Sequence, residues 1–238
     1  VPFRHSLRCV ACSRVLYRAF RLRQRGCDLI QGSTASLSGH AAACAGRDPV
    51  SVFVESHPRQ CFAAHGQAMS FDDRLLDRLK RQCVLRASRA FAPSQWLVDV
   101  CRDHEGLDLD LVRPPFSLQD VVWDDSVLRE RIGAGPYLLF FGQICRLKGA
   151  DLLAEALVRL MPRIADLRVV FVGTDCDFGD GRATLQVVRN KLGGLAARVT
   201  HISWVAHSQL YPIVSAARCV AMPSRVYNLP NAFQETLA

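Results

Sequence analysis

Two apolar runs in the second half of the chain constrain the fold most, because each ends in glycine and is followed by a helical pattern. Pro136–Gly142 (PYLLFFG) and Leu167–Gly173 (LRVVFVG) are predominantly apolar, as is typical of strands buried on both faces. Ala150–Met161 and Arg182–Leu192 follow them with apolar residues at helical spacing. Strand and helix alternate without hairpin signals, so we expect a parallel sheet with helices on both faces.

The same pattern continues along the chain and recurs, less cleanly, in the first half. Further strands are predicted at Cys27–Gln31, Val50–Glu55, Arg89–Ala92, Val199–Ser203 and Arg218–Met222. Further helices are predicted at Thr34–Ala45, Phe71–Ala87, Ser94–Asp103, Gln209–Ala217 with Ser208 as its cap, and from a capping Asn231 to Ala238. We therefore expect an α/β protein with two Rossmann-like sheets, over residues 1–112 and 136–238. Residues 113–135, which hold two prolines and poor periodicity, are predicted to link them.

Composition bounds the remaining possibilities. Half of the residues are hydrophobic, which suffices for a core, and no window approaches the roughly 18 apolar residues of a membrane span. Ten irregularly spaced cysteines indicate reduced thiols and a cytoplasmic location. Cys9 and Cys12 have no second ligand pair, so we expect no zinc site there.

The net charge of +8 is concentrated in an arginine-rich start, where apolar residues at near-helical spacing predict a basic amphipathic helix over residues 4–25. Its charged face is either an ordinary solvated surface or a site that docks on an anionic membrane. Nucleic acid is the least favoured partner, because no nucleic-acid-binding motif is present and the aromatic residues lie in apolar runs.

A phosphate site is predicted where the first apolar strand of the second half ends. Gly142 closes the strand, Arg146 and Lys148 follow, and a helix begins near Gly149. Cations beside a helix N-terminus at the carboxyl end of parallel strands favour phosphate. A solvated loop with two surface cations is the alternative.

Polar residues in two further loops are candidates for binding a ligand or a metal. After Pro230, the free amides of the helix that starts at Asn231 are suited to an anion, and Glu235 to the hydroxyls of a ribose. Equally, Glu235 is an ordinary acid near a helix start. Asp175 and Asp177 have metal-ligand spacing but too few further oxygen ligands, so we expect loop acids and no metal.

Three segments in order resemble the second domain of the family 4 retaining glycosyltransferases, whose fold is called GT-B. They are GQICRLKGADLLAEAL, HISWVAHSQLYPIVSAARCVAMPS and YNLPNAFQETLA. CDLIQGSTASLSGHAAACAG, SVFVESH and ASRAFAPSQWLVDVC resemble the acceptor-side first domain. Because the chain stops within a helix at Ala238 and opens on a helix with no strand before it, we expect an internal fragment. The unpaired sheet edges are expected to make the isolated piece unstable, and the fragment is expected to be inactive.

The resemblance implies site residues. Lys148 and Gly149 match the lysine and glycine that bind the donor diphosphate, whereas Gln143 replaces the usual arginine, with Arg146 close enough to compensate. Glu235 matches the ribose-binding glutamate, and Tyr227 replaces the glutamate that touches the transferred sugar. His57 or Glu55 corresponds to an acceptor-side histidine that faces the sugar, or else His57 is an ordinary loop residue. The full expected donor site comprises Gly142, Gln143, Lys148, Gly173, Tyr227, Asn228, Asn231, Ala232 and Glu235.

The implied reaction transfers a sugar from a nucleoside diphosphate to a glycan, lipid or small-molecule acceptor with retention of configuration. It needs no metal or cofactor if Lys148 and Arg146 stabilise the leaving diphosphate. Two alternatives stay open. The replacements at Gln143 and Tyr227 fit a weak or inactive relative that only binds nucleotide sugars, and the arginine-rich start fits a peripheral module for membranes or polyanions.

Overall fold

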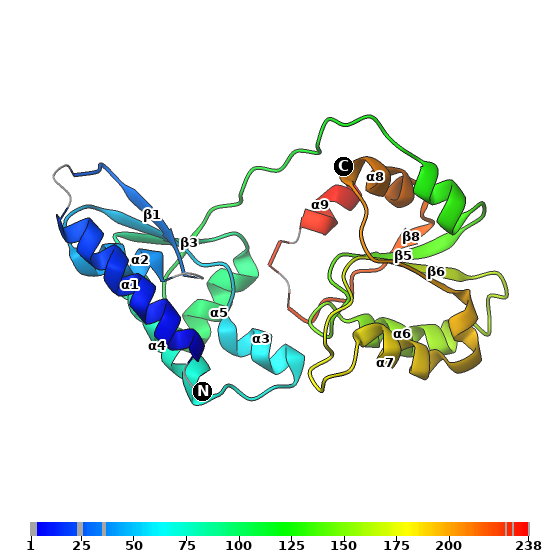
Figure 1. The fold of residues 1–238 in the computed structure, drawn as a ribbon, viewed down its shortest axis with the longest axis horizontal. Coiled ribbons are helices and arrows are strands. Elements are labelled where there is room, and N and C mark those ends of the chain that lie inside the picture. Colours follow the sequence, from blue (N-terminus) through cyan, green and yellow to red (C-terminus); the bar gives the residue numbers. More distant parts are fainter. Residues whose placement is uncertain (1–3, 23–25, 35–36, 227, 230, 238) are drawn as a thin grey trace. The chain divides into compact units, whose positions relative to one another are not determined.

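The computed structural model describes residues 4–22, 26–34, 37–226, 228–229 and 231–237. The chain divides into two compact units (Figure 1). Unit 1 comprises Val1–Ala63 and Gln67–Pro115, and unit 2 comprises Ala64–Gly66 and Phe116–Ala238. Each unit contains a four-stranded, all-parallel sheet.

Unit 1 has the strand order β1-β2-β3-β4. These strands are β1 (Ile30–Ser33), β2 (Val50–Phe53), β3 (Arg89–Ala92) and β4 (Asp110–Leu111). Its helices are α1 (Arg4–Leu22), α2 (Ser38–Ala45), α3 (Pro58–His65), α4 (Phe71–Arg86) and α5 (Gln95–Glu105). β3 has the predicted bounds, whereas β1 begins three residues late because Cys27 N bonds the Asp48 carboxylate in a loop instead of a strand partner.

All the helices of unit 1 lie on one side of its sheet (Figure 1). Val50, Val52 and Ala92 point toward them and are almost fully buried. The opposite face carries Gln31 and Arg89, both exposed, beside the partly buried Phe53–Phe91 ring pair. For this half, the expectation of helices on both faces is therefore wrong for the described residues. The helix α3 and the strand β4 were not predicted either.

Unit 2 has the strand order β7-β6-β5-β8 and confirms the expected two-sided arrangement. Its strands are β5 (Tyr137–Phe141), β6 (Arg168–Val172), β7 (Val199–Ile202) and β8 (Cys219–Val220). The helices α6 (Ala150–Leu160) and α7 (Thr184–Leu192) cover one face, and α8 (His207–Ala216) and α9 (Asn231–Leu237) cover the other (Figure 1).

The alternation of side chains along β5 builds the two cores of unit 2. Phe140 points into a core with Leu153 and Leu157 of α6. Tyr137 and Leu139 point into the other, and the Tyr137 hydroxyl donates a 2.5 Å hydrogen bond to the Ile213 carbonyl of α8. Burial on both faces explains why β5 is apolar throughout.

The segment predicted as a linker is only partly one. From Phe116 onward it belongs to unit 2, and it contains a short π-helical turn, Leu128–Ile132, that was not expected. The cap of α8 was also wrongly predicted, since the helix begins at His207 with Ala206 at the cap position. The Ser208 carbonyl accepts a hydrogen bond from Asp124 N of the segment instead.

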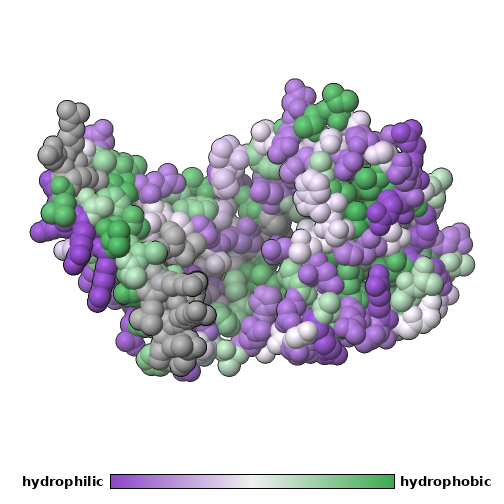
Figure 2. Space-filling model, viewed as in Figure 1, coloured by the Kyte–Doolittle hydropathy of each residue, from purple (hydrophilic) through white to green (hydrophobic). Residues whose placement is uncertain are grey.

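The arginine-rich start forms α1, which ends at Leu22; residues 23–25 of the predicted helix lie outside the described part. Ser13 and Phe20 face the neighbouring helices, while Arg14 and Arg18 are exposed beside Val15. Figure 2 accordingly shows hydrophobic residues next to hydrophilic ones along this helix. Within the described residues, no helix is both long and apolar enough to cross a bilayer.

Candidate functional site

A cavity of about 300 Å³ lies at the carboxyl ends of β5 and β8 in unit 2. The strand ends, the loop before α6, the loop after β8 and the first turn of α9 all contribute to its wall. The lining residues are Phe140, Phe141, Gly142, Gln143, Lys148, Ala221, Met222, Ser224, Asn231 and Ala232. Ligands of open α/β sheets bind at this edge, so the place fits the sequence prediction.

Among the described residues, Lys148 is the one cation in the cavity wall. It is half-buried, and it makes no hydrogen bond or ion pair with any residue that the structure describes. Gln143, Asn231 and Ser224 add uncharged polar groups to the same wall. A cation without a protein partner, in a partly desolvated pocket of neutral donors, favours an anionic ligand such as a phosphate.

Two glycines allow the backbone to pass close to itself under this cavity. Gly149 has φ +74°, and a Cβ there would lie 1.9 Å from the Pro223 carbonyl oxygen. Gly173 has φ +139°, and a Cβ there would lie 1.9 Å from the Gly142 carbonyl oxygen. Gly173 itself does not line the cavity, but it packs against Gly142, which does. The backbone approach explains why glycine is required at both places.

Arg225 holds the loop after β8 in place, and sequence reasoning missed this role. Its guanidinium donates to both carboxylate oxygens of Asp151, at 2.6 and 2.9 Å, and to the Arg146 carbonyl at 2.6 Å. Burial alone would raise the pKa of Asp151, but the hydrogen bonds and charge of Arg225 lower it below its ordinary value. The available signal was Asp151 in the first turn of α6. An acid that becomes buried there needs a positively charged partner, and Arg225 is that partner.

Arg146 is not among the residues that line the cavity. Its guanidinium lies 5.5 Å from the centre of the Phe178 ring. The structure therefore does not bring Arg146 to the position from which it was expected to compensate for Gln143.

Of the other expected donor residues, neither Glu235 nor Asn228 lines the cavity. Glu235 lies one turn beyond Ala232, 13% exposed, with Oε1 3.5 Å from His207 Nε2 on α8, and it is not part of the cavity lining. Asn228 lies in the described loop before α9 and is likewise absent from the lining. Tyr227 lies outside the described residues.

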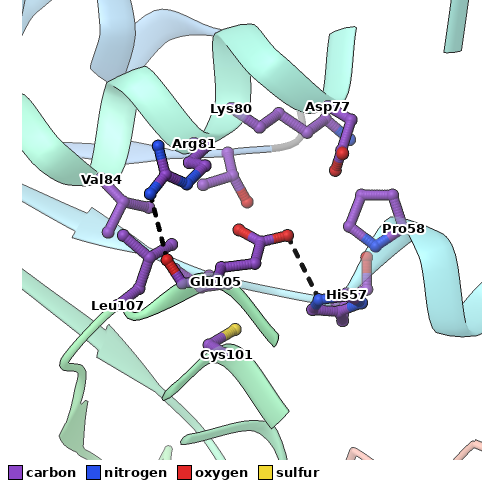
Figure 3. Close-up of a pocket in the computed structure, with 12 residues that line it drawn as sticks. His57, Pro58, Asp77, Lys80, Arg81, Val84, Cys101, Glu105 and Leu107 are labelled. Atoms are coloured by element: carbon purple, nitrogen blue, oxygen red, sulfur yellow. Dashed lines mark hydrogen bonds and ion pairs between the residues drawn. The ribbon is translucent and has the colours of Figure 1, made fainter. Parts of the chain in front are cut away.

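His57 occupies a closed position in unit 1 (Figure 3). It is 2% exposed and precedes α3, where its carbonyl accepts from Cys61 N and its Nδ1 accepts from Gln60 N at 3.4 Å. Nε2 therefore carries the proton, and it faces Glu105 Oε1 at 3.2 Å. The adjoining cavity is only about 20 Å³, enough for one water molecule. The structure thus shows a helix cap and buried pair at the residue expected to face an acceptor sugar.

Asp175 and Asp177 act as loop acids. Asp175 accepts a hydrogen bond from Leu185 N at the start of α7, and Asp177 accepts one from Gly179 N. Across the described part of the chain, no three His, Cys, Asp or Glu side chains are grouped so as to hold a metal ion. No disulfide joins the described cysteines.

Known proteins resemble the chain in sequence and in structure. Residues 135–238 match the family model described as glycosyl transferases group 1. D-inositol 3-phosphate glycosyltransferase from Rhodococcus jostii (strain RHA1) is 30% identical over 154 residues, covering 61% of this chain and 34% of that protein. The chain thus spans about a third of the length of this curated relative.

Solved structures cover nearly the whole chain. Sucrose-phosphate synthase from Thermosynechococcus elongatus has a TM-score of 0.68 at 18% identity, over 96% of this chain and 58% of that one. Anabaena HepE, solved with UDP and glucose, has a TM-score of 0.68 at 18% identity, over 96% and 59%. The UDP-forming α,α-trehalose-phosphate synthase from Burkholderia vietnamiensis has 0.67 at 12%, over 96% and 60%. The chain therefore has the GT-B fold of glycosyltransferases, and its second half resembles the glycosyl transferases group 1 family.

Proposed function

We propose that this chain is the donor-binding and acceptor-side core of a retaining, family 4 type glycosyltransferase that uses a nucleoside-diphosphate sugar. The half-buried, unpartnered Lys148 in the cavity at the β5 and β8 strand ends carries the proposal. The family match over residues 135–238 supports it. HepE is solved with UDP and glucose, which favours UDP as the first nucleotide to test.

In this proposal the cavity binds the diphosphate of the donor. Negative charge grows on the diphosphate as the sugar leaves, and the Lys148 ammonium stabilises it at a fixed position. Because Lys148 supplies this positive charge, transfer proceeds without a divalent cation, and activity should withstand a chelator. Gln143 and Asn231 can donate to phosphate oxygens from the same wall.

The acceptor is proposed to be a glycan, a lipid-linked glycan or a small polar molecule, handled in the cytoplasm. The Rhodococcus relative is named for an inositol phosphate acceptor, which makes small phosphorylated polyols the first acceptors to try.

Nucleotide binding by the complete protein tests the proposal. Titration calorimetry with UDP, GDP and ADP should show one nucleotide that binds, and Lys148→Ala should weaken it at least tenfold, since one charge-assisted contact contributes about 1.5–3 kcal/mol. Arg159→Ala, which removes an exposed cation from α6 outside the cavity, should leave the affinity unchanged. Equal affinity in wild type and Lys148→Ala would exclude this cavity as the diphosphate site.

A weak or inactive relative is the second candidate, favoured by one observation. The cavity wall has an amide, Gln143, where the family has an arginine, and Arg146 does not line the cavity. In that case the protein binds a nucleotide but turns over no sugar across a broad donor panel. Gln143→Arg should then raise turnover, whereas an already active parent protein would dismiss this candidate.

A membrane-docking role of α1 is compatible with the first candidate. Arg14 and Arg18 are exposed beside Val15, which is 69% exposed, and Leu22, which is 80% exposed. Such a face suits an anionic membrane surface. Flotation with phosphatidylglycerol vesicles should carry the protein at low salt, and Arg14→Gln with Arg18→Gln should release it. Failure to float at low salt would remove this role.

A further inference from the structure

A second basic region lies in unit 1, in a groove of about 860 Å³ between α3, the chain before α4, and α4. Of the eight described residues that line it, four are arginines and one is acidic. The lining residues are Arg59, Ala68, Met69, Arg74, Asp77, Arg78, Arg81 and Gln82. The groove is large enough for a ligand of several heavy-atom groups rather than a single water molecule.

The arginines of α4 form one stripe. Arg74, Arg78 and Arg81 are spaced by four and three residues, which places them on one side of the helix along about 10 Å of its axis. Arg74 and Arg78 are exposed, and Arg81 is half-buried. Like charges at these spacings repel one another, so an anion that bridges them relieves a repulsion that the protein alone leaves in place.

The carboxylate among the described lining residues, that of Asp77, is already paired with an arginine. Asp77 is 7% exposed, and its Oδ2 accepts a hydrogen bond from Arg59 Nε at 3.1 Å. Arg81 donates to the Glu105 carbonyl at 3.1 Å, which fixes its guanidinium (Figure 3). Arg74 makes one long hydrogen bond, 3.4 Å from its Nε to the Ser70 carbonyl, and Arg78 makes no hydrogen bond or ion pair with the residues that the structure describes. The groove thus retains several guanidinium N–H donors with no acceptor.

From this geometry we infer that the groove binds a ligand that carries phosphate groups. Guanidinium groups bind phosphate oxygens through paired N–H donors, and a row of about 10 Å spans two phosphate groups of one ligand. The fixed Arg81 and the Arg59–Asp77 pair form the base of the site, while Arg74 and Arg78 close on the ligand. This inference concerns unit 1 alone and does not rest on glycosyl transfer or on the cavity of unit 2.

The test uses the complete protein with the Lys148→Ala substitution, so that a diphosphate cannot bind at the unit 2 cavity. Pyrophosphate is the soluble probe, titrated by calorimetry. Vesicles of phosphatidic acid, with phosphatidylcholine vesicles as their neutral reference, are the lipid probe. Arg74→Gln with Arg78→Gln is the test variant, because glutamine keeps a similar helix propensity and removes only the charges. Arg86→Gln, on the same helix but outside the groove, is the matched control.

We expect pyrophosphate to bind with an affinity that falls as salt rises. The double variant should bind it at least tenfold more weakly, and the control should change it less than twofold. Binding confined to phosphatidic acid vesicles, and lost in the double variant, would assign the same phosphate chemistry to a lipid headgroup. The inference is overturned if neither probe binds at 10 mM phosphate, or if the double variant and the control lose affinity equally. Circular dichroism of both variants must match the parent protein.

Discussion

Gly149 shows how one residue fixes the geometry of the candidate donor site. It lies between Lys148 and the first turn of α6, in a left-handed conformation that favours glycine, against the Pro223 carbonyl. The loop after β8 can therefore approach the α6 N-terminus, where Arg225 bonds Asp151.

Replacing that glycine should be costly. Gly149→Ala places a Cβ within 1.9 Å of a backbone oxygen, so the loop must move, and the positive φ adds strain. We expect a loss of about 2–4 kcal/mol in the free energy of unfolding, measured by urea denaturation. Gly106→Ala is the control, because that glycine has a similar left-handed backbone conformation but open space around its Cβ position. Equal losses in the two variants would show that strain alone, and not the close approach, is responsible.

Glu105 makes the stability of unit 1 depend on pH. The hydrogen bond with His57 lowers the pKa of Glu105, and burial acts to raise it. The charges of Arg59 and Arg81 lower it further, so the net shift is downward from 4.5. A carboxylate whose pKa is lowered by folding stabilises the fold above its unfolded-state pKa. That stabilisation is lost as the pH falls through the lower, folded-state pKa.

Glu105→Gln should therefore lower stability at pH 7 by about 1 kcal/mol and flatten the decline in stability below pH 4.5. Chemical denaturation between pH 3 and 7, in steps of half a unit, measures both effects. Glu130→Gln, an exposed acid in unit 2, is expected to leave the profile unchanged. An unaltered acid limb in Glu105→Gln would contradict the assignment.

At the scale of elements, a proline in α8 explains how the segment before β5 is attached to unit 2. Pro212 has no N–H, so the Ser208 carbonyl four residues earlier loses its helical partner. Asp124 N donates to that carbonyl at 2.9 Å, and Gln209 Nε2 donates to the Asp124 carboxylate at 2.9 Å. Gln119 N adds a hydrogen bond to the Tyr211 hydroxyl. The carbonyl that Pro212 leaves without a helical partner thus binds a segment that was predicted to be the interdomain linker.

Asp124→Ala should loosen this docked segment. It removes the acceptor for Gln209 and for Ser126 N, but keeps the backbone bond to Ser208. Amide hydrogen exchange over residues 116–126 should become at least severalfold faster, while exchange in β5 stays as it is. Asp120→Ala removes an exposed acid from the same segment and should change neither region. Equal acceleration in both variants would indicate that the segment is held by something other than the Asp124 contacts.

At the scale of the whole molecule, the described residues form two separate sets of cores. Unit 1 packs its helices on one face of its sheet, whereas unit 2 packs helices on both faces. Each unit has its own sheet and its own buried side chains, so each meets the requirement for a cooperative transition.

Differential scanning calorimetry of the complete protein should therefore resolve separate transitions for the two units. Gly149→Ala should lower the midpoint of one, and Glu105→Gln the midpoint of the other, because the two residues lie in different units. A single transition that both substitutions shift together would show that the units unfold as one.

Unit 2 was the more predictable half because its strands are apolar on both faces and its helices carry regular stripes. In unit 1 the strands β2 and β3 are only four residues long, which is too short a pattern to show that helices cover one face of the sheet only. At the site, Lys148 and Gly149 were found because a strand, a basic loop and a helix start are adjacent in sequence. Arg225 was missed because its partner lies 74 residues away.

The sequence by itself determined the parallel α/β organisation, the place of the basic loop at a strand end, and the glycines that such a turn requires, since periodicity and backbone preference are local properties. Only the tertiary structure decided which charges are free and which are paired. Lys148 remains without a partner in the cavity wall, whereas Arg225 is neutralised by Asp151 and His57 is enclosed with Glu105. These outcomes depend on contacts between residues distant in the chain, and burial then sets what each charge costs and which ligand it can bind.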